Sequence, residues 1–170
     1  MAQSSFARLL CQGAVLFVAF VAAETPALAE RSSQAAGPFA ALVGSWSGSG
    51  TVSLANGSNE RIRCQAAYAT GNDLNNLRSV LRCASDSYKF ELNSDVRDEG
   101  GKITGAWREA TRNVTGPIAG TASGGDLQAN IDMPGFAAGL NIATRGDKQV
   151  VSLRSQGTEL TGISITFSRK

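Results

Sequence analysis

The 170-residue chain contains no histidine, and this absence removes many kinds of site at once. Ser–His and Cys–His nucleophilic systems are excluded, as are the common histidine-based zinc, copper and haem sites. Three acidic residues cluster near a predicted turn, Asp95, Asp98 and Glu99, but they lack the spacing of a calcium-binding loop. We therefore expect no metal and no cofactor.

Other features are scarce as well. The chain has no basic tract and no interleaved aromatic series, which argues against a nucleic-acid surface. No segment has the period of a long amphipathic helix, and only one apolar run occurs, Ala14 to Ala23. That run is too short to span a bilayer as a stable helix, so we expect a protein that is not embedded in a membrane.

The first 29 residues have the pattern of a signal peptide. Arg8 precedes the apolar run, and Ala27-Leu28-Ala29 ends in the small residues typical of a cleavage site before Glu30. Cys11 would be removed with this segment. The sequence thus predicts export to the bacterial periplasm, with secretion into the medium left open, followed by a flexible lead-in and short helical turn over residues 30–43 and one domain over residues 44–170.

From Gly44 onward the apolar residues recur with a period of two, which is typical of strands. In the predicted second strand this alternation places Ile62, Cys64, Ala66 and Tyr68 inward and Arg61, Arg63 and Gln65 outward. It places Tyr88 and Phe90 inward in the fourth strand, and Leu140, Leu153 and Ile163 inward in the last three strands. Asn56-Gly57 has the composition of a tight hairpin turn, and glycine-rich turns follow at short intervals. Consecutive short strands with short turns predict an all-β, antiparallel up-and-down meander of about 8–10 strands. Closing it into a small barrel would remove the unpaired sheet edges.

The two cysteines of the predicted domain are expected to form a disulfide. If the second and third strands form a hairpin in which Ala69 lies opposite Arg78, the same register places Cys64 opposite Cys83 on the inward face. Directly opposed residues of an antiparallel pair are close enough to bridge. Export to an oxidising compartment favours the bond over two free thiols.

Five residues are candidates for contact with a ligand inside the barrel: Trp107, Glu109, Tyr68, Tyr88 and Phe90. The aromatic members also fit an ordinary core. Glu109 is the acid on the predicted inward face; it would orient a polar ligand, lie in water at the barrel mouth, or pair with Arg108 or Arg112. Because carboxylate catalysis needs two converging acids, we predict that the protein is not an enzyme.

Gly44-Ser45-Trp46, after a helical turn and at the start of the first strand, resembles the G-x-W signature of lipocalin and avidin-like barrels. The resemblance implies structural roles for Gly44 and Trp46, with the tryptophan closing one barrel end and a late arginine, Arg169 or Arg154, packed on it. Two further stretches, residues 81–88 and 105–113, are similar to a family of exported bacterial proteins of uncharacterised activity.

Two functions remain after these exclusions. The first is a lipocalin-like barrel that holds a small, apolar molecule. The second is an envelope protein that binds another protein, such as a secreted hydrolase that it inhibits, without a ligand cavity. The inward-facing glycines fit both functions, because they would leave room for a ligand or let the walls of a solid core approach closely.

Overall fold

The computed structural model describes residues 37–133, 135–156 and 158–170. Within these ranges it contains ten strands: β1 (Gly44–Leu54), β2 (Asn59–Thr70), β3 (Asn76–Ala84), β4 (Lys89–Glu99), β5 (Lys102–Glu109), β6 (Val114–Ser123), β7 (Asp126–Met133), β8 (Phe136–Arg145), β9 (Lys148–Gln156) and β10 (Leu160–Arg169). The predicted signal peptide and most of the predicted lead-in lie outside the described residues. None of the described segments is a helix long and apolar enough to cross a membrane.

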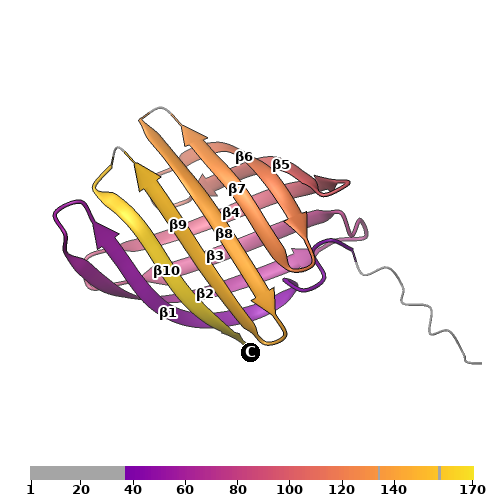
Figure 1. Ribbon diagram of the computed structural model, residues 1–170, viewed down its shortest axis with the longest axis horizontal. Helices are drawn as coiled ribbons and strands as arrows, with labels where there is room; N and C mark the ends of the chain where they lie inside the picture. The colour runs from indigo at the N-terminus through magenta and orange to yellow at the C-terminus, as the bar shows by residue number, and fades with distance from the viewer. Residues whose placement is uncertain (1–36, 134, 157) are drawn as a thin grey trace, which may run out of the picture. The chain divides into compact units, whose positions relative to one another are not determined.

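Every strand pairs antiparallel with its neighbours in sequence, and β1 also pairs with β10, so the sheet is a closed barrel (Figure 1). The prediction of an all-β up-and-down barrel is confirmed, with ten strands. Closure leaves no strand edge free to pair with another chain. In this order β3, β4 and β5 lie across the barrel from β8, β9 and β10.

The alternation of side chains is clearest in β2. Ile62, Cys64 and Ala66 are buried, while Arg63 and Gln65 between them are exposed. Successive side chains of a strand point to opposite faces of the sheet, so one face of each strand forms the barrel interior and the other meets water. The predicted inward and outward sets of this strand are confirmed.

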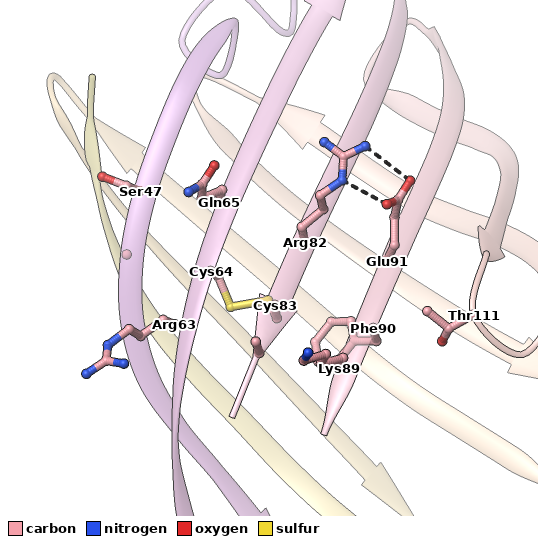
Figure 2. Close-up of a pocket in the computed structure, with 12 residues that line it drawn as sticks. Ser47, Arg63, Cys64, Gln65, Arg82, Cys83, Lys89, Phe90, Glu91 and Thr111 are labelled. Atoms are coloured by element: carbon pink, nitrogen blue, oxygen red, sulfur yellow. Dashed lines mark hydrogen bonds and ion pairs between the residues drawn. A yellow bond between two sulfur atoms is a disulfide. The ribbon is translucent and has the colours of Figure 1, made fainter. Parts of the chain in front are cut away.

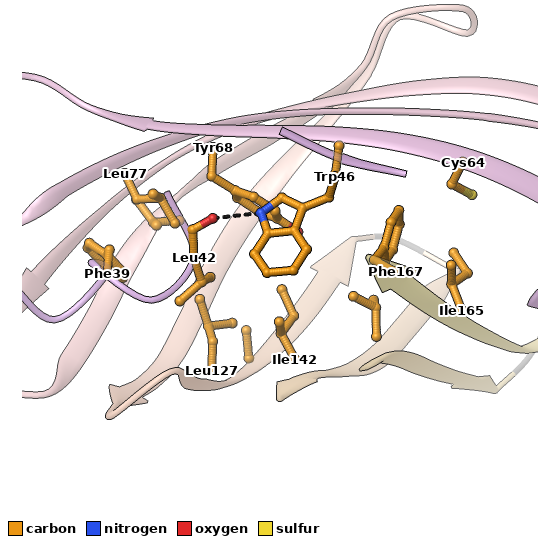
Figure 3. Close-up of a cluster of buried hydrophobic side chains, with 14 of the residues drawn as sticks. Phe39, Leu42, Trp46, Cys64, Tyr68, Leu77, Leu127, Ile142, Ile165 and Phe167 are labelled. Atoms are coloured by element: carbon orange, nitrogen blue, oxygen red, sulfur yellow. Dashed lines mark hydrogen bonds between the residues drawn. The ribbon is translucent and has the colours of Figure 1, made fainter. Parts of the chain in front are cut away.

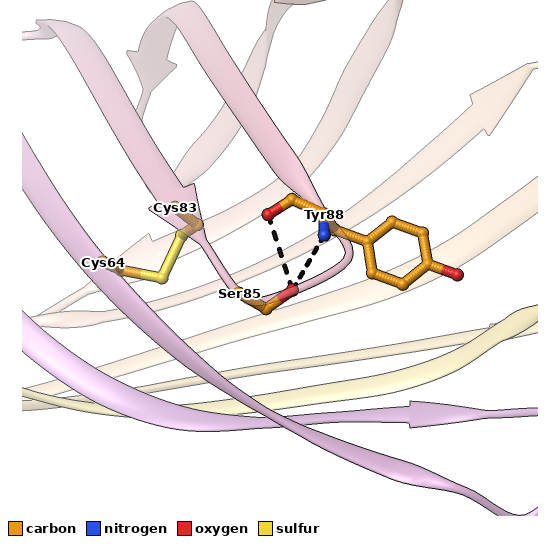
Figure 4. Close-up of a disulfide and its surroundings, with 4 residues drawn as sticks. All are labelled: Cys64, Cys83, Ser85 and Tyr88. Atoms are coloured by element: carbon orange, nitrogen blue, oxygen red, sulfur yellow. Dashed lines mark hydrogen bonds between the residues drawn. A yellow bond between two sulfur atoms is a disulfide. The ribbon is translucent and has the colours of Figure 1, made fainter.

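The Cys64–Cys83 disulfide joins β2 and β3 with a Cα–Cα distance of 4.1 Å. Ala69 pairs with Arg78 and Cys64 with Cys83, which confirms the predicted register. Beyond Cys83 the chain turns through Ser85, whose backbone N–H donates to Tyr88 O (2.8 Å). The Ser85 Oγ accepts from the Tyr88 N–H (3.0 Å) and donates to Tyr88 O (3.4 Å), as Figure 4 shows. Tyr88 therefore belongs to this turn, not to the fourth strand as the alternation predicted.

One end of the barrel is closed by the segment before β1. Residues 38–42 form consecutive turns, in which the Val43 N–H reaches Phe39 O at 3.3 Å with helical spacing, although no helix forms. Phe39, Leu42 and Trp46 are 0%, 1% and 0% exposed, and they meet Phe167 of β10 in one cluster (Figure 3). We call this end the plugged end.

Arg169 holds this plug in place. Its guanidinium lies over the Trp46 ring, 4.2 Å from the centroid, and donates to the carbonyl oxygens of Ala41 (2.9 Å) and Val43. Gly44 makes this approach possible, because a Cβ there would lie 2.7 Å from Arg169 Nη1 and the backbone φ is +128°. The structure thus places Arg169, not Arg154, on the tryptophan.

Three inward glycines allow the strands to bend around the barrel. A Cβ at Gly50, Gly105 or Gly120 would lie 1.8–2.1 Å from a backbone oxygen of the neighbouring strand. A side chain at these positions would clash with that oxygen, so glycine here lets neighbouring strands lie close together. Gly116 differs, since it leaves the space that the Trp107 ring fills, with Nε1 2.7 Å from the position of a Cβ.

Candidate functional site

The barrel interior is not packed evenly along its length. Near the plugged end the inward side chains are buried, including Leu127, Ile142 and Val151 at 5%, 8% and 6% exposure. Toward the other end, where the β3–β4, β5–β6 and β9–β10 turns lie, Val52, Ile62 and Cys64 of β1 and β2 are buried, but several inward apolar side chains of the other strands are half-buried and pack on the core. We call this half of the interior the open half.

Six of the half-buried side chains lie on two opposite walls. On one wall are Leu81, Leu92 and Trp107 of β3, β4 and β5; on the other are Leu140, Leu153 and Ile163 of β8, β9 and β10. Within each wall they are direct cross-strand partners or near neighbours: Leu140 pairs with Leu153 and Leu153 with Ile163. These side chains keep part of their apolar surface exposed, which is the kind of surface that a small apolar ligand covers.

Trp107 is the predicted candidate that lies in the open half with an unused polar group. It is half-buried in β5 opposite Ser94 and Gly116, and its Nε1–H has no acceptor among the described residues. In contrast, the Nε1–H of Trp46 donates to Leu42 O at 2.8 Å. An unmet buried N–H is unfavourable by about 1–3 kcal/mol, so an acceptor atom of a ligand placed at this N–H would be favourable.

Phe90 and Tyr88 lie at the rim of the open half. Phe90 is the first inward residue of β4, half-buried beside its partner Cys83. Tyr88 is half-buried in the preceding turn, and its ring points away from the disulfide (Figure 4). The structure brings Phe90 to the same wall as Trp107 and leaves Tyr88 at the edge of it.

Tyr68 lies deeper, toward the plugged end. Its hydroxyl donates to Gln149 Oε1 (3.2 Å), and Gln149 Nε2 donates to Thr144 Oγ1 (3.1 Å). Burial raises the pKa of Tyr68 well above its ordinary value, so the phenol stays protonated. With its hydroxyl engaged across the barrel, Tyr68 supports the floor of the open half.

Glu109 is 7% exposed and closes the β5–β6 turn. Its carboxylate accepts hydrogen bonds from the backbone N–H groups of Glu91 (3.2 Å), Thr111 (3.1 Å) and Arg112 (2.6 Å) and from the Thr111 hydroxyl. Arg112 Nη1 lies 3.8 Å away. Of the three predicted environments, the arrangement corresponds to pairing with Arg112, and the oxygens that would orient a ligand are engaged by the turn.

The hydrogen bonds also set the charge of this group. Burial by itself would raise the pKa of Glu109, but the Thr111 hydroxyl and the backbone N–H groups outweigh it and the pKa is lowered. A carboxyl whose folded pKa lies below its unfolded value adds stability above the unfolded value, and this stability is lost as the pH falls through the folded value. Glu109 is therefore ionised at neutral pH.

We expect Glu109→Gln to lower the free energy of unfolding at pH 7 by about 1–3 kcal/mol, because charge-assisted bonds to the turn become neutral ones. Urea unfolding at a series of pH values measures it. The difference from the parent protein should shrink as the pH falls through the lowered pKa, since a protonated Glu109 resembles glutamine. Glu99→Gln, at the exposed β4–β5 turn, is the control. A constant difference at all pH values would contradict the assignment.

A concavity of about 640 Å³ lies outside the barrel, on the outer face of β1–β4 (Figure 2). Its walls include the outward side chains Arg63, Gln65, Arg82 and Glu91, and Arg82 Nε lies 2.8 Å from Glu91 Oε2. The buried Cys64 and Cys83 and the half-buried Phe90 also line it. The Arg82 and Glu91 charges on this face are paired with each other. We therefore place the candidate site in the open half and not on this outer face.

Sequence reasoning missed two polar residues of the site, Ser79 and Ser94. They are inward-facing partners on β3 and β4, and their hydroxyl oxygens are 2.7 Å apart. The signal that could have found them is a small polar residue in an otherwise apolar inward row. The opposite wall, Leu140, Leu153 and Ile163, was predicted to face inward but was not assigned to a site.

Comparison with known proteins identifies the fold and nothing finer. The crystal structure of Rv2717c from M. tuberculosis aligns with a TM-score of 0.60 and 14% identity over 78% of this chain and 94% of that one. The S-type phycobiliprotein lyase CPES from Guillardia theta aligns with a TM-score of 0.52 and 17% identity over 78% and 90%. No family model matches the sequence, and no curated protein matches it significantly.

Proposed function

We propose that the protein binds a small apolar molecule in the open half of the barrel without transforming it. The observation that carries this proposal is the half-burial of inward apolar side chains on two facing walls, with the interior beyond them fully packed. Pockets for small ligands are mostly apolar with a few placed polar groups, and this composition matches the open half. Covering the apolar surface would supply the binding free energy.

The proposal includes export to the periplasm or the medium, as the N-terminal 29 residues predict. The Cys64–Cys83 bond supports it, because disulfides form and persist in oxidising compartments. The phycobiliprotein lyase has the same fold, but at 17% identity none of its activity is carried over to this chain. The alternative, an envelope protein that binds a partner protein, would use the concavity on the outer face of β1–β4, where the Arg82 and Glu91 charges are already paired with each other.

Native mass spectrometry of the full chain, expressed in its own host and purified gently, tests the proposal. We expect a mass above that of the denatured protein by the mass of one small molecule. Leu153→Trp should reduce the ligand-bound fraction and weaken binding by about tenfold, because the larger ring fills the open half and overpacking typically costs about 1–3 kcal/mol.

Val150→Trp is the matched control, since Val150 lies on the outward face of the same strand and is 47% exposed. It should leave the ligand-bound fraction unchanged. If the folded parent protein had equal native and denatured masses, the assignment would move to a protein-binding role. The same would follow if both variants lost the same share of the ligand-bound fraction.

A further inference from the structure

A row of polar groups crosses one wall of the open half. Tyr68, Ser79, Ser94 and Trp107 are successive cross-strand partners on β2, β3, β4 and β5, and all four point inward. The facing wall carries Leu140, Leu153 and Ile163 together with Ser155, whose hydroxyl donates to Leu160 O. The row on β2–β5 is thus the more polar part of the open half, although Leu81 and Leu92 lie beside it.

The polar row has hydrogen-bond donors in excess. Ser79 and Ser94 carry two hydroxyl hydrogens, and the 2.7 Å contact between their oxygens uses one of them. The other remains for a further acceptor. The Nε1–H of Trp107, which lies on the Gly116 side of its strand, has no acceptor among the described residues. The Tyr68 hydroxyl is engaged with Gln149.

The charges that face the open half are negative. Glu60 of β2 and Glu109 of β5 are its inward-facing ionisable residues, and among the described lysines and arginines none points inward there. The Ser85 hydroxyl, which donates to Glu60 Oε2 (2.6 Å), lowers the pKa of Glu60, and Glu109 is held ionised by its turn. Arg112 lies at the rim and is paired with Glu109.

We propose that the ligand of the open half is uncharged and carries a hydrogen-bond acceptor, such as the carbonyl of an ester, amide or ketone, that bonds to the Ser79–Ser94 pair. This inference rests on the proposed function and specifies its ligand. An ionised carboxylate would meet Glu60 and the Glu109–Arg112 pair, whose charges already compensate each other, and leaving water without a further compensating charge is unfavourable. Fatty acids are therefore excluded as the preferred ligand class, and their neutral derivatives are included.

Diphenylhexatriene, a fluorescent hydrocarbon without acceptor atoms, is the probe for the test. Its fluorescence should rise on binding to the folded protein, and competitors then displace it at neutral pH. We expect methyl dodecanoate to displace the probe at a concentration about tenfold or more below that required for dodecanoate, both kept below the concentration at which they aggregate.

Ser79→Ala/Ser94→Ala should weaken binding of the methyl ester by about fivefold, the value of one hydrogen bond, and leave the affinity for diphenylhexatriene unchanged. Ser49→Ala/Ser164→Ala, which removes two exposed outward hydroxyls, is the matched control. If the probe does not bind, the proposed function fails. If the probe binds but dodecanoate competes as well as the ester, or the inward serine variant leaves ester affinity unchanged, the function stands and this inference is wrong.

Discussion

Trp46→Ala is expected to lower the free energy of unfolding by about 4 kcal/mol, near the upper end for a single core substitution. The ring is 0% exposed and is packed with Phe39, Leu42 and Phe167. Alanine would leave a cavity among these residues, remove the 2.8 Å bond to Leu42 O and remove the ring beneath Arg169. Equilibrium urea unfolding followed by circular dichroism measures the loss.

Trp107→Ala is the matched control, because it removes the same side chain from a half-buried position where the Nε1–H has no acceptor. It should lower the free energy of unfolding by less than half as much. If Trp46→Ala is too unstable to measure, Trp46→Phe should still be less stable than the parent, since the bond to Leu42 and part of the packing are lost. Equal losses at the two tryptophans would contradict the role of Trp46 as the plug.

Cys64→Ala/Cys83→Ala is expected to lower the free energy of unfolding by about 3 kcal/mol. The two cysteines are separated by 19 residues, and a cross-link over a loop of this length restricts the unfolded chain by about that amount in the chain-entropy model. Both positions are buried on the inward face, so alanine introduces no polar group. Urea unfolding with and without a reductant measures the effect.

The reductant provides the internal control for this variant. It should lower the stability of the parent protein by a similar amount and leave the alanine variant unchanged. If the parent protein were equally stable in reduced and oxidised form, the disulfide would not stabilise the fold. Its role would then have to lie in the folding process or in a redox reaction of the two cysteines.

The fold was predictable from the sequence because its signals are local. Alternation along β2 separates Ile62 and Cys64 from Arg61 and Arg63, and Asn56-Gly57 suits a tight turn with Gly57 at a φ of +83°. The disulfide register followed from pairing Ala69 with Arg78, since one pair fixes all others in a regular hairpin. Tyr88 was misplaced because alternation continues through a turn that only the Ser85 hydrogen bonds reveal.

The candidate site was predictable only in part. Trp107 and Phe90 were found because inward aromatics stand out in an alternating pattern. The environment of Glu109 was not decided, because the bonds that engage its carboxylate come from Glu91 on the neighbouring strand as well as from its own turn. Ser79 and Ser94 were missed because the sequence does not show which side chains surround an inward-facing serine.

The sequence by itself determined which residues point inward, the antiparallel order of the strands and the pairing of Cys64 with Cys83, because alternation and hairpin register depend on neighbours along the chain. Only the tertiary structure decided that Arg169 covers Trp46, that Gly50, Gly105 and Gly120 serve close contact between strands, and that one half of the interior is open while the other is packed. These features depend on distances between side chains and backbone atoms of different strands, and for Arg169 and Gly50 on the pairing of β1 with β10 that closes the barrel.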